Sequence, residues 1–242
     1  MRAVVMSNKR LAKDVFDLRV ALGSETRPGA PGSFYHIACG GERLLRRPIS
    51  VCGAWDDVVR FVYAVRGEGT KWLSGVCSGA RLDMLGPLGR GFDLADEPTL
   101  LVGGGIGVPP MVFCAERIDA PVHAILGFRD ADAVILTGAF ASFDLLTDDG
   151  SAGDKGYPHE KLRERLAGGE WKNVLACGPR PMLKAVAKVC AEFGVRCQVS
   201  MEERMACGVG ACLVCACAVG GTYKRVCADG PVFNAEEVDW DV

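Results

Sequence analysis

Four cysteines crowd into the eleven residues from 207 to 217, and three of them have a spacing that could hold metal. Cys207, Cys212 and Cys215 follow the pattern C-x4-C-x2-C. This is the spacing by which a plant-type [2Fe-2S] cluster takes three of its four thiolate ligands. The residues between them are mostly small, so backbone amides can turn toward the sulfurs. The pattern therefore predicts an iron-sulfur centre.

The fourth thiolate has two candidates. Cys227 follows twelve positions after Cys215, beyond Gly220-Gly221, where a hairpin would bring it back to the other three. Cys217 is nearer in sequence, but a C-x-C pair would strain the loop. A structural zinc site is the alternative for the whole group, and such sites usually use C-x2-C pairs. The four-residue gap favours the iron-sulfur cluster, with Cys227 as its fourth ligand.

The chain has 12 cysteines, which is many for a protein without a secretory segment. No apolar stretch of secretory length precedes Lys9, so the cysteines are expected to stay reduced in the cytoplasm. Those outside the cluster are expected to be small core residues. Cys52 and Cys177 are weak exceptions because they lie beside the motifs described next.

Glycines form a second candidate site between a predicted strand and a predicted helix. Gly103, Gly104, Gly105 and Gly107, with Ile106 among them, fill the turn. Such a turn presents backbone amides and a helix N-terminus to a pyrophosphate. The match to the dinucleotide-binding fingerprint is incomplete, because residue 110, a proline, stands where the closing glycine usually is.

A second turn of this kind is Cys177-Gly178-Pro179, which also follows a predicted strand and opens a predicted helix. Both turns would lie at the carboxyl edge of one parallel sheet, where such folds bind ligands. Together they predict a nucleotide site.

Two motifs in the N-terminal third fit a second nucleotide. Arg47-Pro48-Ile49-Ser50 begins a predicted strand, where an arginine can clamp a phosphate and a serine hydroxyl can meet a ring nitrogen. Residues 67–70, ending in Gly69-Thr70, give a further phosphate cradle at a helix start. Two phosphate sites in one barrel suggest a dinucleotide flavin.

The elements that must position these residues divide the chain in three. Residues 1–95 alternate as six short strands, at 3–6, 15–22, 34–38, 49–52, 58–65 and 81–85, with one helix at about 70–76, which predicts a small antiparallel barrel. Residues 96–200 alternate strands with helices, as in a doubly wound parallel sheet. Residues 201–242 have no regular period and contain the cysteine cluster. The turn-rich stretch 86–91 marks the hinge between the first two parts.

Composition narrows the possible partners. Lys and Arg number 28 against 30 Asp and Glu, and they are scattered, which argues against nucleic acid or an anionic membrane as a partner. The uncharged stretches 98–115 and 205–223 are broken by Gly, Pro or Cys, so neither predicts a membrane-spanning helix. The three histidines share no common spacing and have no neighbouring carboxylate arrangement, so no catalytic residue is assigned.

The order of the four nucleotide motifs resembles the ferredoxin-reductase superfamily, which has an FAD barrel followed by a nicotinamide-binding domain. Residues 201–215 and 223–233 narrow the resemblance to the electron-transfer subunits of type B, NAD-dependent dihydroorotate dehydrogenase, and it covers essentially the whole chain. In that family the cluster ligands fall on Cys207, Cys212, Cys215 and Cys227. The spacing from the third ligand to the fourth is short for the family, which implies a trimmed hairpin.

The resemblance also implies which residues hold the other cofactors. The flavin site comprises Arg47, Pro48, Ile49, Ser50, Val62, Tyr63, Ala64, Gly69 and Thr70. Ile49 stands where the superfamily often has tyrosine, so an aliphatic side chain would cover the flavin there. The nicotinamide nucleotide site comprises Gly103, Gly104, Gly105, Ile106, Gly107, Pro110, Cys177, Gly178 and Pro179.

The mechanism implied is electron splitting. Dihydroorotate is oxidised on a separate FMN-containing catalytic subunit, in a heterotetramer with two copies of each chain. Electrons then pass singly through [2Fe-2S] to FAD, which delivers a hydride to NAD⁺ as co-substrate. A flavin and iron-sulfur subunit of a hydrogenase, sulfite reductase or transhydrogenase is the nearest alternative. Asp130 and Asp132 favour NAD over NADP, whereas Arg129 beside them argues the reverse.

Overall fold

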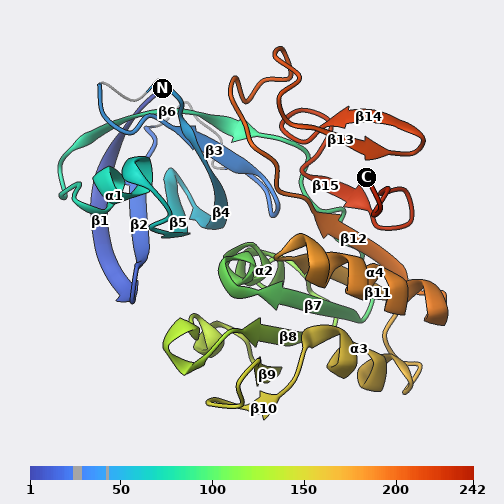
Figure 1. Cartoon of the computed structure of the whole chain (residues 1–242). Coiled ribbons are helices and arrows are strands. Elements are labelled where there is room, and N and C mark those ends of the chain that lie inside the picture. Colours follow the sequence, from blue (N-terminus) through green and yellow to red (C-terminus); the bar gives the residue numbers. More distant parts are fainter. Residues whose placement is uncertain (24–28, 42–43) are drawn as a thin grey trace.

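The computed structural model describes residues 1–23, 29–41 and 44–242 (Figure 1). Its N-terminal part is a closed antiparallel barrel in the order β1-β2-β5-β4-β3-β6. The strands are β1 (Arg2–Ala12), β2 (Val15–Ala21), β3 (Phe34–Ile37), β4 (Arg47–Trp55), β5 (Val58–Ala64) and β6 (Arg81–Leu88), and helix α1 (Glu68–Ser74) precedes β6. The predicted six strands and helix are confirmed, although β1 and β4 run further than expected.

Alternation along the strands decides what fills the barrel. On β5, Val59, Phe61 and Tyr63 are buried in the barrel core, whereas Val62 between them belongs to a different core cluster. This is the period of two that a strand imposes on its side chains. The Val62 side chain therefore points out of the barrel and packs against the second part of the chain.

The second part is a seven-stranded sheet in the order β10-β9-β8-β7-β11-β12-β15. All neighbours are parallel except β12 and β15. The strands are β7 (Thr99–Gly104), β8 (Val122–Phe128), β9 (Phe143–Thr147), β10 (Asp154–Lys155), β11 (Asn173–Cys177), β12 (Arg196–Ser200) and β15 (Val232–Asn234). The chain leaves β7 toward β8 on one side, and its later strand β11 lies on the other. The strand order therefore reverses between β7 and β11.

Helices cover both faces of this sheet, as the predicted doubly wound architecture requires. Helix α2 (Val108–Ala115) packs on the Leu101 side, together with barrel residues Cys52 and Val62. Helices α3 (Pro158–Leu166) and α4 (Arg180–Phe193) pack on the opposite side, against Leu100 and Val102. Short 3-10 turns are η1 (Gly105–Gly107), η2 (Ala131–Ala133) and η3 (Thr137–Ala139).

The C-terminal part contains more regular structure than its sequence predicts. A hairpin joins β13 (Ala216–Val219) to β14 (Thr222–Arg225), with Val219 opposite Thr222, so Gly220-Gly221 form its turn as expected. Strand β15 then pairs with β12. Cys215, Val226 and Phe233 belong to the same core cluster as Leu100 and Val174. The segment thus shares the core of the nucleotide sheet instead of building its own.

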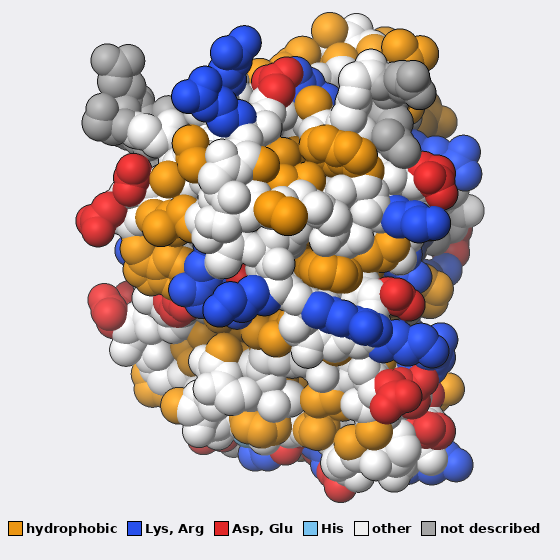
Figure 2. All heavy atoms as spheres, turned by 90° about the vertical axis from the view of Figure 1, so that its left-hand side faces the viewer, with side chains coloured by type: hydrophobic (Ala, Val, Ile, Leu, Met, Phe, Trp, Pro, Cys, Tyr) orange, Lys and Arg blue, Asp and Glu red, His pale blue; other side chains and the backbone are white. Residues whose placement is uncertain are grey.

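Figure 2 shows one face of the molecule, the side on which the barrel lies. On the barrel side of the molecule, basic, acidic and hydrophobic side chains are interspersed (Figure 2). Among the described residues, no helix is both long enough and apolar enough to cross a membrane.

Candidate functional site

The two glycine turns meet at the point where the strand order reverses. In the register of β11 and β7, Cys177 lies opposite Gly103. A Cβ on Gly107 would collide with the carbonyl group of Cys177 and would stand 2.6 Å from the Gly178 nitrogen. A Cβ on Gly178 would be 3.1 Å from the Gly104 backbone. The two turns thus pack backbone against backbone, at the position where open α/β sheets bind ligands.

The other residues predicted for the nucleotide site lie in or beside these two turns. Gly105 has φ +52, a left-handed conformation that favours glycine and lets the chain turn into α2. Pro110 is buried within the first turn of α2, directly after the glycine turn. Pro179 is the N-cap residue of α4, and its Cδ would lie 3.0 Å from a Cβ on Gly104. Ile106 packs against the core cluster on the α2 side.

Asp130, one of the two acidic residues after β8, is held by local interactions. Asp130 accepts hydrogen bonds from Arg129 Nε at 2.8 Å and from the Ala133 nitrogen at 3.0 Å, and these bonds lower its pKa. Its carboxylate therefore caps η2, and Arg129 extends beside it into solvent.

Arg47 and Gly69, two residues predicted for the flavin site, are in contact. A Cβ on Gly69 would lie 2.6 Å from Arg47 Cζ, so only glycine lets the guanidinium rest against this turn of α1. Thr70 Oγ1 accepts hydrogen bonds from the nitrogens of Arg66, at 2.8 Å, and Gly67, at 3.3 Å. The threonine hydroxyl therefore shapes the start of α1, and Arg47 supplies the charge.

The remaining flavin candidates differ in which way they face. Tyr63 is buried in the barrel, and its hydroxyl is 3.2 Å from Asn8 Oδ1, so only its backbone can line an outer site. Ile49 is 9% exposed and packs into the barrel core. Ser50 and Ala64 are half-buried, and Val62 faces α2.

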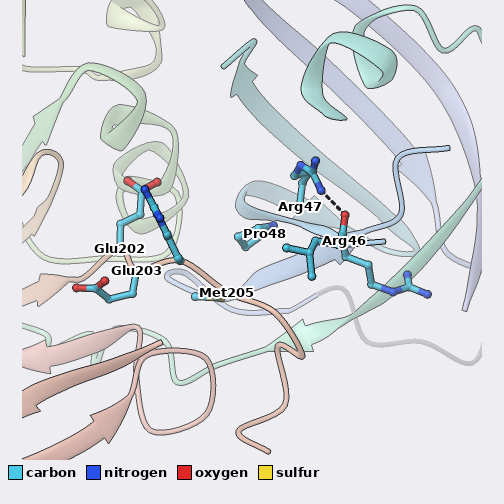
Figure 3. Close-up of a pocket in the computed structure, with 8 residues that line it drawn as sticks. Arg46, Arg47, Pro48, Glu202, Glu203 and Met205 are labelled. Atoms are coloured by element: carbon cyan, nitrogen blue, oxygen red, sulfur yellow. Dashed lines mark hydrogen bonds between the residues drawn. The ribbon is translucent and has the colours of Figure 1, made fainter. Parts of the chain in front are cut away.

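A hollow of about 520 Å³ lies between the barrel and the C-terminal part (Figure 3). One wall consists of residues 45–48, at the start of β4, and the other consists of residues 202–205. Figure 3 shows Arg47 and Pro48 on one side, and Glu202 and Glu203 on the other. The second wall leads directly into the first cluster cysteine. The hollow therefore lies between the predicted flavin motif and the predicted cluster.

The four predicted ligands are grouped as two pairs of sulfurs. Cys207 and Cys212 interact through their side chains, as do Cys215 and Cys227. The second pair is buried, whereas Cys212 is exposed. Within the described residues, no group of three or more His, Cys, Asp or Glu side chains is arranged to hold a metal ion. The four thiols match in number the four-cysteine ligand set of a [2Fe-2S] centre.

Backbone amides point at three of these sulfurs. The Gly210 nitrogen donates to Cys227 Sγ at 3.1 Å, the Cys227 nitrogen to Cys215 Sγ at 3.4 Å, and the Val209 nitrogen to Cys207 Sγ at 3.5 Å. The Val209 bond is the largest cause that lowers the pKa of Cys207, to about 6. Donors of this kind stabilise thiolates, the form in which cysteine binds metal.

An arginine clamps the cluster loop to the hairpin. Arg225 Nη1 donates to the Gly210 carbonyl at 3.1 Å, while its Nε and Nη2 each donate to the Asp229 carboxylate at 2.8 Å. These bonds orient the residue whose amide reaches Cys227. The sequence patterns did not single out Arg225 and Asp229, because neither residue is a predicted cluster ligand.

Cys217 is a buried residue of the hairpin. It lies on β13, where burial alternates, and it is 6% exposed. Burial raises the pKa of both candidate thiols, Cys217 to about 11 and Cys227 to about 12, so position and not pKa separates them. The position of Cys217 fits a core residue and leaves Cys227 as the partner of Cys215.

One histidine near the cluster was missed because its neighbours are far apart in sequence. His36 lies on β3, fully buried, with its ring against Gly208. Burial lowers its pKa, and the nearby Arg46 lowers it further.

Known proteins share the sequence and the fold of this chain. Residues 202–239 match the family described as the iron-sulfur cluster binding domain of dihydroorotate dehydrogenase B. The chain is 41% identical to the dihydroorotate dehydrogenase B (NAD(+)) electron transfer subunit of Caldanaerobacter subterraneus subsp. tengcongensis, over 98% of each chain. The chain belongs to this family. The same subunit of Fusobacterium nucleatum is 37% identical, over 97% of this chain and 96% of the relative.

Membership confirms the resemblance and makes the chain an oxidoreductase subunit that works with a catalytic partner. Among solved structures, an NADH-dependent reduced ferredoxin-NADP oxidoreductase, described in connection with flavin-based electron bifurcation, has a TM-score of 0.88 and 31% identity. The match covers 99% of this chain and 90% of that one. The predicted fold class, a barrel followed by a parallel-sheet domain and a cluster segment, is confirmed by the architecture and by this likeness.

Proposed function

We propose that this chain takes electrons released by dihydroorotate oxidation on its catalytic partner and delivers them to NAD⁺. The observation that carries the proposal is the hollow between residues 45–48 and residues 202–205. It adjoins the arginine that would hold a flavin phosphate, and its second wall continues into Cys207. A flavin bound there would lie beside the cluster, as electron transfer between them requires.

Each cofactor has its own set of residues. Cys207, Cys212, Cys215 and Cys227 would hold [2Fe-2S], with the Gly210 and Cys227 amides donating to two of their sulfurs. Arg47 and the turn at Gly69-Thr70 would hold the FAD pyrophosphate, and Ser50 would reach the flavin ring. When bound, these groups and the nicotinamide supply single-electron and hydride chemistry. The protein supplies their order and spacing.

The nicotinamide nucleotide would bind at the two turns that meet between β7 and β11. The backbones of Gly104, Gly107 and Gly178 lie close together there, and α2 begins at residue 108. Asp130 at the end of β8 suits a free ribose hydroxyl, which supports NAD over NADP. Its carboxylate is preorganised by Ala133 and Arg129.

The partner would be an FMN-containing catalytic subunit, in a heterotetramer with two of each chain, located in the cytoplasm. Exposed apolar side chains surround the exposed ligand Cys212: Val209 is 53% exposed and Leu213 is 64% exposed. Such residues at the tip of the loop would pack against the partner and bring the cluster near its electron donor.

A second candidate is a flavin and iron-sulfur subunit of another reductase complex. The 31% identity to the NADH-dependent reduced ferredoxin-NADP oxidoreductase chain over almost the whole length favours it above unrelated functions. The two candidates share every cofactor and differ in the partner that donates electrons.

Anaerobic visible absorption tests the proposal. The chain is measured alone and with its co-purified partner, before and after dihydroorotate and, separately, NADH. We expect NADH to bleach the flavin and cluster bands in both samples, and dihydroorotate to bleach them only with the partner. Bleaching by NADH alone in both samples would contradict the dihydroorotate pathway and favour the second candidate. Absence of both bands would overturn the cofactor assignment.

A further inference from the structure

His36 lies where the predicted flavin motif meets the cluster loop. In the pairing of β3 with β4 it stands opposite Pro48, one of the residues lining the hollow. Its ring edge faces Gly208, the residue after Cys207: a Cβ on Gly208 would be 2.5 Å from Nδ1 and 3.1 Å from Cε1. One imidazole therefore contacts both regions.

The ring is short of hydrogen-bond partners. His36 is 0% exposed, and neither Nδ1 nor Nε2 has a partner of normal geometry among the described residues. The Cys207 backbone is near enough to oppose the lowering of the His36 pKa. The Phe34 ring stands edge-on at 6.5 Å and offers no acceptor. Buried polar groups are nearly always paired, so an orphaned one calls for a bound group that completes it.

The imidazole can donate a hydrogen bond in either protonation state. A neutral imidazole carries one N–H donor and one acceptor, and both ring nitrogens donate when it is protonated. The donor therefore depends on the position of the ring against the cluster loop.

The loop is shaped to admit the ring. Gly208 has φ +74, a left-handed conformation, and a side chain there would occupy the place of Nδ1. Glycine at this position thus serves both the turn between two ligands and the approach of His36. The Nδ1 edge is the part of the ring that reaches the loop.

We propose that His36 is a positioning residue for the iron-sulfur centre, whose Nδ1–H donates a hydrogen bond to sulfur on the Cys207 side. The inference rests on the proposed function, since it requires the cluster. Hydrogen bonds to the sulfurs of such centres help to set their reduction potentials. The reduced centre is the more negative, so it gains more from a donor, and His36 raises the potential.

The test is a redox titration of the complete complex, following the cluster by electron paramagnetic resonance and the flavin by absorbance. His36→Phe removes the donor and keeps a planar ring. His36→Asn places an amide nitrogen at the branch position of Nδ1, whereas His36→Gln places it further out. His159→Phe on α3, in the nucleotide domain, is the matched control.

We expect His36→Phe to favour the oxidised cluster by about three- to tenfold, a shift of roughly 30–60 mV to lower potential. The His36→Asn cluster should stay nearer to the wild-type potential than the His36→Gln cluster, and His159→Phe should change nothing. If His36→Phe fails to retain the cluster, the Asn and Gln comparison decides.

Three results would overturn the inference: an unchanged cluster potential in His36→Phe, a shift confined to the flavin, or Asn and Gln variants that behave alike. Failure of the proposed function looks different. In that case the wild-type complex itself would lack the cluster signal, or would not be reduced by dihydroorotate.

Discussion

Replacing Gly107 by alanine tests whether the nucleotide site lies where the two turns meet. The added Cβ would collide with the Cys177 carbonyl group and stand 2.6 Å from the Gly178 nitrogen. All three neighbours are backbone atoms at the end of β11, so no side-chain rotation relieves the clash. Gly107 has φ −79, which alanine adopts easily, so the clash alone sets the cost.

The magnitude follows from overpacking. Forcing one extra carbon into a packed region costs about 1–3 kcal/mol, and a backbone clash belongs at the upper end. For a chain of this length, about 3 kcal/mol corresponds to a fall in melting temperature of roughly 6–12 °C. Separation of the two turns should also weaken NADH binding by at least about tenfold, which is roughly 1.4 kcal/mol.

The assay is anaerobic flavin reduction at increasing NADH, together with thermal unfolding. Gly138→Ala in η3 is the control, because a Cβ there meets nothing within 4 Å. The FAD content of Gly107→Ala should match that of the control, since the barrel is untouched. Equal NADH affinity in the two variants would refute the placement of the nucleotide at this point. Equal melting temperatures would refute the packing argument.

Three further predictions concern the cluster and the nucleotide sheet. Cys212→Ser should abolish or severely reduce the cluster absorbance, whereas Cys217→Ser should retain it; similar spectra for the two would disprove the ligand assignment. Asp229→Asn breaks the clamp on Arg225 and should speed the loss of cluster absorbance in air about fivefold, corresponding to roughly 1 kcal/mol. Asp241→Asn is the surface control. Equal rates of absorbance loss in the two variants would count against the clamp. Burial raises the pKa of Asp144, but hydrogen bonds from Arg165 and His123 outweigh it, so the pKa is lowered on balance. Its contribution to stability is therefore full above about pH 4 and is lost as the pH falls through the folded-state pKa. The melting temperature of Asp144→Asn should accordingly lie below that of wild type at pH 7 and converge with it in acid, and a constant difference would contradict this.

Local patterns predicted most of the fold. Alternation in segments such as residues 58–65 gives the barrel strands, because the period of two is set within each strand. The strand-turn-helix pattern around Gly103 and around Cys177 places both turns at one edge of the sheet, since carboxyl ends of parallel strands share an edge. The C-x4-C-x2-C spacing likewise acts within a few residues. Each of these signals is short in range.

What sequence could not predict depends on contacts between distant segments. His36 and Gly208 are 172 positions apart (208 − 36), and no local period connects a barrel strand with the cluster loop. The pairing of β15 with β12 was also missed, because three residues are too few to give a period. Tyr63 was predicted, together with Val62 and Ala64, to line the flavin site. Only the strand register shows that the Tyr63 side chain points into the barrel instead. The individual cofactor contacts and the domain boundaries at 95/96 and 200/201 stay predictions.

The pairing of β15 with β12 also bears on how the cluster is loaded. Ser200 pairs with Val232, and the Met201 nitrogen donates to the Pro231 carbonyl at 2.8 Å, so the cysteine segment leaves and re-enters the sheet at adjacent points. It is topologically an insertion whose ends the folded sheet already holds together. Much of the entropy needed to bring Cys207 and Cys227 together is therefore lost when the sheet forms, before any iron arrives. Assembly of the metal centre can accordingly follow folding as a local event.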